Sequence, residues 1–196
     1  MEQIQDGTGK GYLAKVDTEN RLLTSSITSA REEHASESGF SYNINTGVIT
    51  LTNATITPVL YIKNNEEYDL IITSLIYQTG ASANASGTTI LVDVQRNPTT
   101  ISFSTAVEMN INRNFGSSRT LSVTAYKGAT GATMSGGTKA FESILAVTTQ
   151  RIAIATGAIT LPRGSSIGIN FTAATGNTSQ AVEFAVACFL NNLTGE

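Results

Sequence analysis

The sequence predicts an all-β protein, an antiparallel and jelly-roll-like β-sandwich preceded by an extended N-terminal arm. Threonine, alanine, glycine, serine, asparagine and isoleucine dominate, helix formers such as leucine, glutamate and lysine are scarce, and tryptophan is absent. β-Branched residues recur at alternate positions, as in strands with one buried face. About ten such segments occur, with turn signals about every 8–15 residues, a spacing typical of sandwiches and barrels.

The chain of 196 residues fits one domain with an arm. We expect residues 1–39 to form the arm, because apolar residues are sparse there and lack a helical period. Short alternations at Tyr12–Val16 and Arg21–Thr24 are possible strands within it, and the charged stretch from Arg31 to Glu37 is typical of a solvated surface. Residues 40–196 are expected to form the sandwich.

The expected strands follow from alternation, and their ends follow from turn residues. In order they are Phe40–Thr52, Pro58–Asn64, Tyr68–Thr79, Thr88–Asn97, Val107–Asn112, Thr120–Lys127, Ala140–Thr148, Arg151–Leu161, Ser166–Ala173 and Ala181–Asn191. The polar residues 64–67 predict a hairpin between the second and third strands. The Gly/Ser/Ala-rich residues 80–87 predict a loop, and Asn97-Pro98 ends the fourth strand because proline lacks a ladder donor.

Two alternatives to a sandwich are disfavoured. No segment shows a helical period over about twelve residues or more, and no fixed-period repeat indicates a propeller or solenoid. Two four-stranded sheets in jelly-roll order suit the strand count best. The strand order itself does not follow from the sequence.

Composition also narrows the function. Charged residues are 14% of the chain and the net charge is −3, so we expect no nucleic-acid partner. No apolar run approaches about 18 residues, so we expect no membrane span, and the acidic start does not predict a secretory signal. The single cysteine, Cys188, shares a strand face with Val182, Phe184, Val186 and Leu190, which predicts a buried core residue.

The candidate chemical sites do not predict an enzyme, a cofactor or a metal. Gly7-Thr8-Gly9-Lys10-Gly11 lacks the Ser or Thr, the preceding strand and the following helix of a phosphate loop. The single histidine, His34, lies in the arm without an evident partner. Asp93 and Glu183 alternate with apolar neighbours, so we expect both to face away from the core.

One stretch predicts an interface instead of a catalytic site. Arg113 and Arg119 bracket a polar turn that carries Phe115, and arginines and aromatics are frequent interface anchors. The alternative is an ordinary hairpin whose Phe115 packs into the core. The glycine-rich residues 128–138 are expected to be mobile or ordered by a neighbour.

Four phrases resemble structural proteins of tailed bacteriophages. They are GKGYLAKVDTENRLLTSS from Gly9, SYNINTGVITLT from Ser41, LYIKNNEEYDLII from Leu60 and NRNFGSSRTLSVTAYKGATG from Asn112. The resemblance implies a non-enzymatic virion component on the capsid surface, made in the host cytoplasm. It implies a trimeric decoration or cement protein whose partners are the major capsid protein or other virion proteins.

The expected contacts with the shell lie in the arm and in the turn. The arm residues are Tyr12, Lys15, Val16, Arg21 and Leu22, and those of the body are Arg113, Phe115 and Arg119. Two alternatives remain open. One is a head–tail or tail component. The other is a carbohydrate- or receptor-binding sandwich that uses residues 128–138 and tyrosines, namely Tyr42, Tyr61, Tyr77 and Tyr126.

Overall fold

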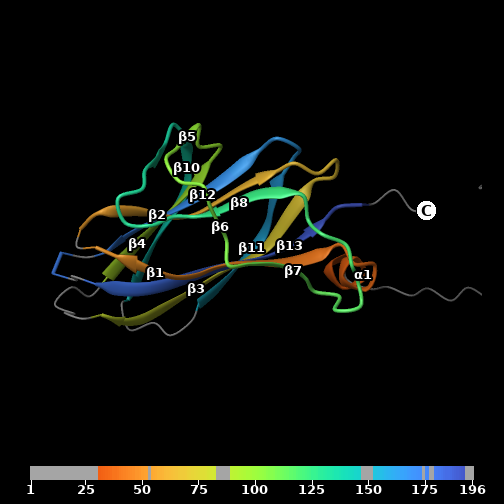
Figure 1. Ribbon diagram of the computed structural model, residues 1–196, viewed down its shortest axis with the longest axis horizontal. Coiled ribbons are helices and arrows are strands. Elements are labelled where there is room, and N and C mark those ends of the chain that lie inside the picture. Colours follow the sequence, from red (N-terminus) through yellow and green to blue (C-terminus); the bar gives the residue numbers. More distant parts are fainter. Residues whose placement is uncertain are drawn as a thin grey trace, which may run out of the picture. The chain divides into compact units, whose positions relative to one another are not determined.

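Figure 1 shows the computed structural model, which describes residues 31–52, 54–82, 89–146, 152–173, 175–176 and 179–192. Residues 31–196 form one compact unit, separate from residues 1–30. The elements are α1 (Arg31–Glu37), β1 (Ser41–Leu51), β2 (Ile56–Asn64), β3 (Leu70–Ser82), β4 (Thr89–Arg96), β5 (Thr100–Ile101), β6 (Thr105–Ala106), β7 (Met109–Asn112), β8 (Val123–Lys127), β9 (Met134–Ser135), β10 (Thr138–Ala146), β11 (Ile152–Leu161), β12 (Ser166–Ala173) and β13 (Gln180–Leu190). The predicted antiparallel β-sandwich is confirmed.

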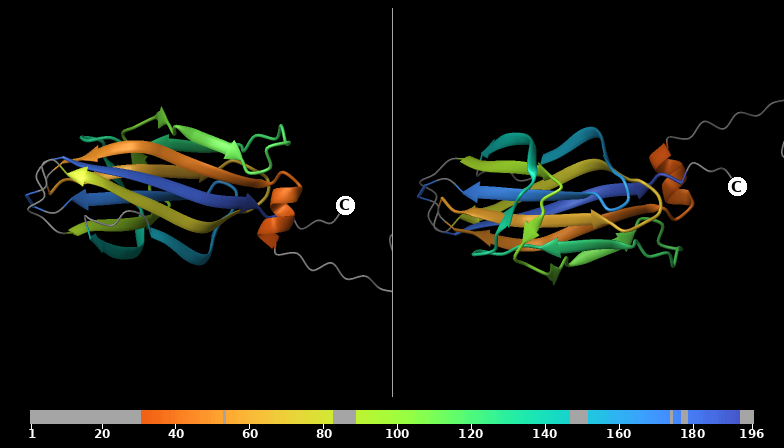
Figure 2. Two further views of the ribbon diagram at one scale, coloured as in Figure 1. Left: turned by 90° about the horizontal axis from the view of Figure 1, so that it is seen from below. Right: turned by 90° about the horizontal axis from the view of Figure 1, so that it is seen from above.

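The strands of the described ranges form two main sheets (Figure 2). The five-stranded sheet has the order β11-β3-β13-β1-β7, and the six-stranded sheet has the order β10-β4-β12-β2-β8-β6. Four antiparallel pairs join early strands to late ones, namely β1 with β13, β2 with β12, β3 with β11 and β4 with β10. This is the order of a long hairpin rolled on itself, the jelly roll. Residues 97–137, between β4 and β10, are an insertion into that order.

The predicted hairpin of the second and third strands is wrong. Strand β2 belongs to the six-stranded sheet and β3 to the five-stranded sheet, so residues 65–69 cross between the layers. The buried Asn64 holds this crossing, because its Nδ2 donates to the carbonyl oxygens of Tyr68 at 2.9 Å and Leu161 at 2.8 Å. A polar turn between two apolar runs is therefore compatible with a hairpin or with a crossing between sheets. The jelly-roll pairing of the strands determines which of the two forms.

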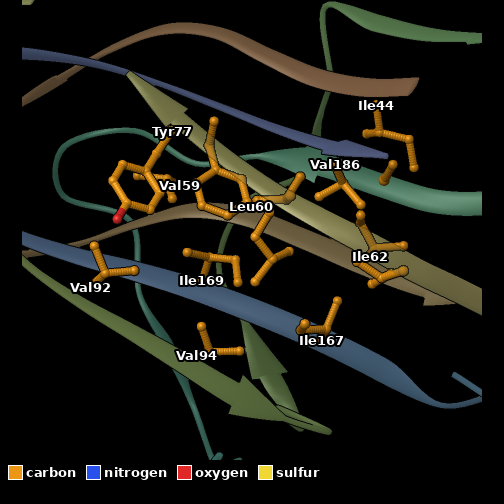
Figure 3. Close-up of a cluster of buried hydrophobic side chains, with 14 of the residues drawn as sticks. Ile44, Val59, Leu60, Ile62, Tyr77, Val92, Val94, Ile167, Ile169 and Val186 are labelled. Carbon is orange, nitrogen blue, oxygen red and sulfur yellow. The ribbon is translucent and has the colours of Figure 1, made fainter. Parts of the chain in front are cut away.

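The core lies between the two sheets (Figure 3). Inward side chains of the five-stranded sheet, such as Ile44, Tyr77 and Val186, meet Ile62 and Ile169 of the six-stranded sheet. Each is at most 2% exposed, and burial of such a side chain stabilises the fold by roughly 1.5–3 kcal/mol.

Alternation correctly predicts which residues face this core. Cys188 is 0% exposed, as predicted from its strand face. On β4, Ile90, Val92 and Val94 are buried, and Asp93 between them is half-buried on the opposite face. Glu183 is likewise half-buried and lies on the opposite face of β13 from the buried Val182 and Phe184.

Residues 31–37, expected within an extended arm, form the helix α1. Glu32 and Glu33 lie in its first turn, where carboxylates favour the helix dipole. Gly39, with φ of 74°, ends it. The amide of Gly39 donates to the carbonyl of Ser36, and that of Phe40 to the carbonyl of Ala35, which is a Schellman motif.

Helix α1 is held by packing onto the outer face of the five-stranded sheet. Its Ala35 forms a small buried cluster with Ile71 of β3 and Phe189 of β13, and Phe40 packs against them. Seven residues are too few for a helix that is stable by itself. Tertiary contacts with distant strands therefore determine this element.

The expectation for residues 128–138 is also wrong, because the chain's own sheet orders them. Strand β9 pairs with β5, which places Met134 opposite Ile101. Met134 is 8% exposed, and its side chain covers Gly168 so closely that a Cβ there would lie 2.4 Å from its sulfur. This part of the insertion covers the outer face of the six-stranded sheet (Figure 1).

Candidate interaction surface

The predicted residues Arg113, Phe115 and Arg119 lie on one turn, which we call the Phe115 turn (residues 113–119). It follows the edge strand β7 of the five-stranded sheet and leads toward β8 of the six-stranded sheet. It is therefore a crossing between sheets and not the hairpin considered above. In Figure 1 it lies at the end of the sandwich that carries α1.

Side-chain oxygens shape the backbone of the Phe115 turn. The Oδ1 of Asn112 accepts from the amide of Asn114 at 2.9 Å, and the Oδ1 of Asn114 accepts from the amide of Gly116 at 3.0 Å. The Oγ of Ser117 accepts from the amide of Arg119 at 3.2 Å. Such local bonds fix a turn without a strand or helix.

The same asparagines attach the turn to the end of α1. The Nδ2 of the buried Asn112 donates to the carbonyl of Gly39 at 2.7 Å and to that of Arg119 at 3.2 Å. The Nδ2 of Asn114 donates to the carbonyl of Glu37 at 2.8 Å. The turn is therefore anchored at its base.

The two arginines of the turn contact other residues of the same chain. Arg113 forms an ion pair with Glu32 of α1, and its Nη1 also lies 3.3 Å from the Oγ of Ser41. The guanidinium of Arg119 lies 4.1 Å from the centre of the Phe40 ring, which is a cation–π contact. Both arginines thus brace the turn.

Phe115 projects from this braced base into solvent. It is 91% exposed, so the alternative in which it packs into the core is wrong. Two further apolar side chains, Met109 and Ile111 of β7, are 47% and 46% exposed. A hollow of about 290 Å³ lies beside them, lined by Ile111, Phe115, Arg119 and neighbours. An aromatic side chain held out by a rigid turn is a typical interface anchor.

The titratable groups beneath this surface have structural roles. Burial raises the pKa of the Tyr42 phenol, and the Arg119 guanidinium opposes that shift. The phenol therefore stays neutral and donates to the carbonyl of Gly39 at 3.2 Å. Burial raises the pKa of the Cys188 thiol to about 12, so this thiol is not a nucleophile at neutral pH.

Other candidate residues lie outside the described part of the chain, on α1 or in the core. The arm residues Tyr12, Lys15, Val16, Arg21 and Leu22, and the glycine-rich residues 7–11, lie outside the described residues. His34 is exposed on α1. Tyr42, Tyr61 and Tyr77 are buried, so these three cannot act as a stacking platform for a sugar.

The described residues also bear on metal sites and membrane spans. Among them, no group of three or more His, Cys, Asp or Glu side chains lies in one place. No helix in that part of the chain is long and apolar enough to cross a membrane.

Comparison with known proteins leaves the family open. The chain matches no model of a protein family, and no curated protein matches it.

The sequence reasoning missed the asparagines that build the turn. Asn110, Asn112 and Asn114 stand at alternate positions before Gly116. This Asn-rich spacing is a recognisable signal for Asx turns. The partners of Asn112 and Asn114, Gly39 and Glu37, are distant in sequence, and no local signal predicts them.

Proposed function

We propose that this protein is a non-enzymatic virion structural protein of a tailed bacteriophage, a trimeric decoration protein that binds the assembled head shell. The observation that carries the proposal is Phe115, an aromatic side chain that is 91% exposed on a turn fixed by hydrogen bonds. The phrases that resemble phage structural proteins support the same class, and one of them contains this turn.

The Phe115 turn suits a docking role because its geometry exists before binding. A turn that is already ordered loses little conformational entropy when a partner covers it. The described body begins at α1, whose last turn is bonded to Asn114. The rest of the predicted arm, residues 1–30, lies outside the described residues. We propose that arm and turn together contact the shell.

Binding of this kind stabilises a shell through mass action. A protein that binds only the assembled form shifts the equilibrium toward assembly. A trimer presents three copies of the arm and turn around one axis, which multiplies weak contacts. The jelly roll itself occurs in capsid and lectin domains alike, so the surface and not the fold supports the proposal.

The test compares two exposed apolar residues. Phe115→Ala removes the proposed anchor, and Ile144→Ala removes a side chain that is 70% exposed on β10. Both variants should keep the free energy of unfolding within about 0.5 kcal/mol of the parent protein. Co-sedimentation with heads assembled from the major capsid protein of the same genome should show at least tenfold weaker binding for Phe115→Ala, which is about 1.4 kcal/mol. Ile144→Ala should bind normally.

Light scattering should give the mass of a trimer for the purified chain. Binding to tails but not heads would place the protein in the tail. A monomer that sediments with neither particle would contradict the proposal.

A further inference from the structure

A polar row crosses the outer face of the six-stranded sheet, away from the Phe115 turn. The antiparallel register places Glu142 of β10 opposite Asp93 of β4, and Asp93 opposite Asn170 of β12. The neighbours of Asp93 and Asn170 along their strands, such as Val92 and Ile169, belong to the core. Asp93 and Asn170 therefore point to the outer face.

A second row lies beside the first. Lys139 of β10 pairs with Gln95 of β4, and Gln95 pairs with Gly168 of β12. Gln95 is two residues from Asp93, so its side chain points to the same face. The Nε2 of Gln95 donates to the Oδ2 of Asp93 at 3.2 Å. Gln95, Asp93 and Asn170 thus form one cluster.

Three oxygens of this cluster are buried without a donor. They are the Oδ1 of Asp93, the Oε1 of Gln95 and the Oδ1 of Asn170, and none has a hydrogen-bond partner within the described part of the chain. Asn170 is only 2% exposed. Buried polar atoms are normally satisfied, because each unpaired one costs about 1–3 kcal/mol. Three neighbouring acceptors therefore point to a ligand that carboxylate and amide oxygen atoms can coordinate.

Lys139 does not supply the missing partner. Its ammonium pairs with Glu142 and donates a hydrogen bond to the Oε2 of that carboxylate. The ammonium lies 3.9 Å from the Oδ1 of Asp93, beyond hydrogen-bond distance. The Lys139 side chain is 53% exposed, so it lies at the rim of the cluster and can move away.

We propose that Asp93, Gln95 and Asn170 bind a Ca²⁺ ion through these three oxygens. Carboxylate and amide oxygens are the ligands that hard divalent cations prefer. Ca²⁺ accepts irregular sets of about six to eight oxygens, and water completes the shell. Mg²⁺ requires a near-octahedral shell and retains its own water, so a cluster of one carboxylate and two amides favours Ca²⁺.

The position of the site suggests what the ion does for the fold. Gln95 lies against Gly137, where an added Cβ would be 3.2 Å from its Oε1. Gly137 immediately precedes β10, at the point where the insertion of residues 97–137 returns to the sheet. A bound ion would therefore fix the end of the insertion against β4 and β12.

The first experiment uses the full chain, treated with EDTA and then dialysed. Calorimetric titration with CaCl₂ should show one site per chain, and MgCl₂ at equal ionic strength should bind at least tenfold more weakly. Ca²⁺ should also raise the Tm, because a ligand that binds only the folded state stabilises it. Absence of both Ca²⁺ heat and a Tm shift would overturn the proposal, and so would equal binding of the two ions.

Four variants make the test specific. Asp93→Asn should abolish Ca²⁺ binding. Glu183→Gln removes one charge from the outer face of the other sheet, where Asn45 donates to Glu183 at 2.7 Å, and it should leave the Kd unchanged. Lys139→Gln removes a competing cation and should lower the Kd several-fold. Binding by Asp93→Asn equal to that of Glu183→Gln would overturn the proposal.

The fourth variant, Asn170→Asp, keeps the test decisive if Asp93→Asn does not fold. A second carboxylate in the cluster should increase the rise in Tm that Ca²⁺ produces. Without a metal site, the added buried charge would lower the Tm equally with and without Ca²⁺, and that result would contradict the proposal. Neither outcome depends on the phage function proposed above.

Discussion

Among single residues, Cys188 has the clearest link between burial and chemistry. Its side chain is 0% exposed and its sulfur lies 3.7 Å from the carbonyl oxygen of Tyr42. Burial raises the thiol pKa to about 12, whereas the ordinary value is 9.0. The native protein should therefore not react with a thiol reagent at pH 8, and denaturant should expose one thiol per chain.

The same pKa makes a prediction about stability. Above pH 9 the unfolded chain loses the thiol proton while the folded chain keeps it, so the contribution of Cys188 is complete below pH 9 and is lost toward pH 12. The loss is about 1.4 kcal/mol per pH unit within that window. Urea unfolding of the parent protein and of Cys188→Ala should show a difference in stability that shrinks from pH 9 to 10.5. A constant difference would contradict the assignment.

Residue orientation was predictable where only the period of a strand decides it. Cys188 faces the core and Asp93 and Glu183 face away, as alternation indicates. Asn112 was not predictable, because its partner Gly39 lies far away along the chain. The cluster of Asp93 and Asn170 was not predictable for the same reason, because only the pairing of β4 with β12 brings the two residues together.

At the scale of elements, α1 determines where the arm can be removed. Its Ala35 covers Ile71 and Phe189. Deletion of residues 1–39 would expose both side chains, whereas deletion of residues 1–30 leaves the helix in place. The longer deletion should lower the free energy of unfolding by about 2 kcal/mol or more relative to the shorter one. Chemical denaturation of the two truncated proteins measures this difference, and equal stabilities would contradict the role of α1.

Strand existence was far more predictable than strand pairing. The ten expected segments correspond to β1–β4, β7, β8 and β10–β13. In β4 and β13, buried residues alternate with less buried ones over several positions. The two-residue strands β5, β6 and β9 have no such pattern and are defined only by their partners. The helix α1 was missed because it is short and depends on contacts with β3 and β13.

At the scale of the whole molecule, the jelly-roll order predicts slow folding. Ser41 of β1 is opposite Phe189 of β13, and Ile62 of β2 is opposite Ile167 of β12. Closing such long loops costs entropy before the contacts form. Stopped-flow refolding should therefore take milliseconds to seconds, and the control Phe115→Ala should refold at the same rate. Refolding within microseconds would contradict this expectation.

The sandwich was predictable because composition and alternation act on every strand at once. The strand order was not, because two sheets with similar apolar faces can be connected in several ways. Asn64 shows the difficulty, since its residue type indicates a turn whether the chain pairs back or crosses to the other sheet. The sequence places Arg113, Phe115 and Arg119 close together along the chain, whereas the exposure of Phe115 and the internal contacts of the two arginines depend on the complete fold.

The insertion of residues 97–137 separates two kinds of evolutionary constraint. Core packing constrains the eight paired strands, because a change of even one methylene group in a close-packed core alters stability. Phe115, on the insertion, is 91% exposed, so a binding partner and not the core constrains this residue. Drift in the tip of the Phe115 turn can therefore alter recognition while the framework is inherited unchanged. The fold thus allows the binding surface to change without any change in the residues that stabilise the core.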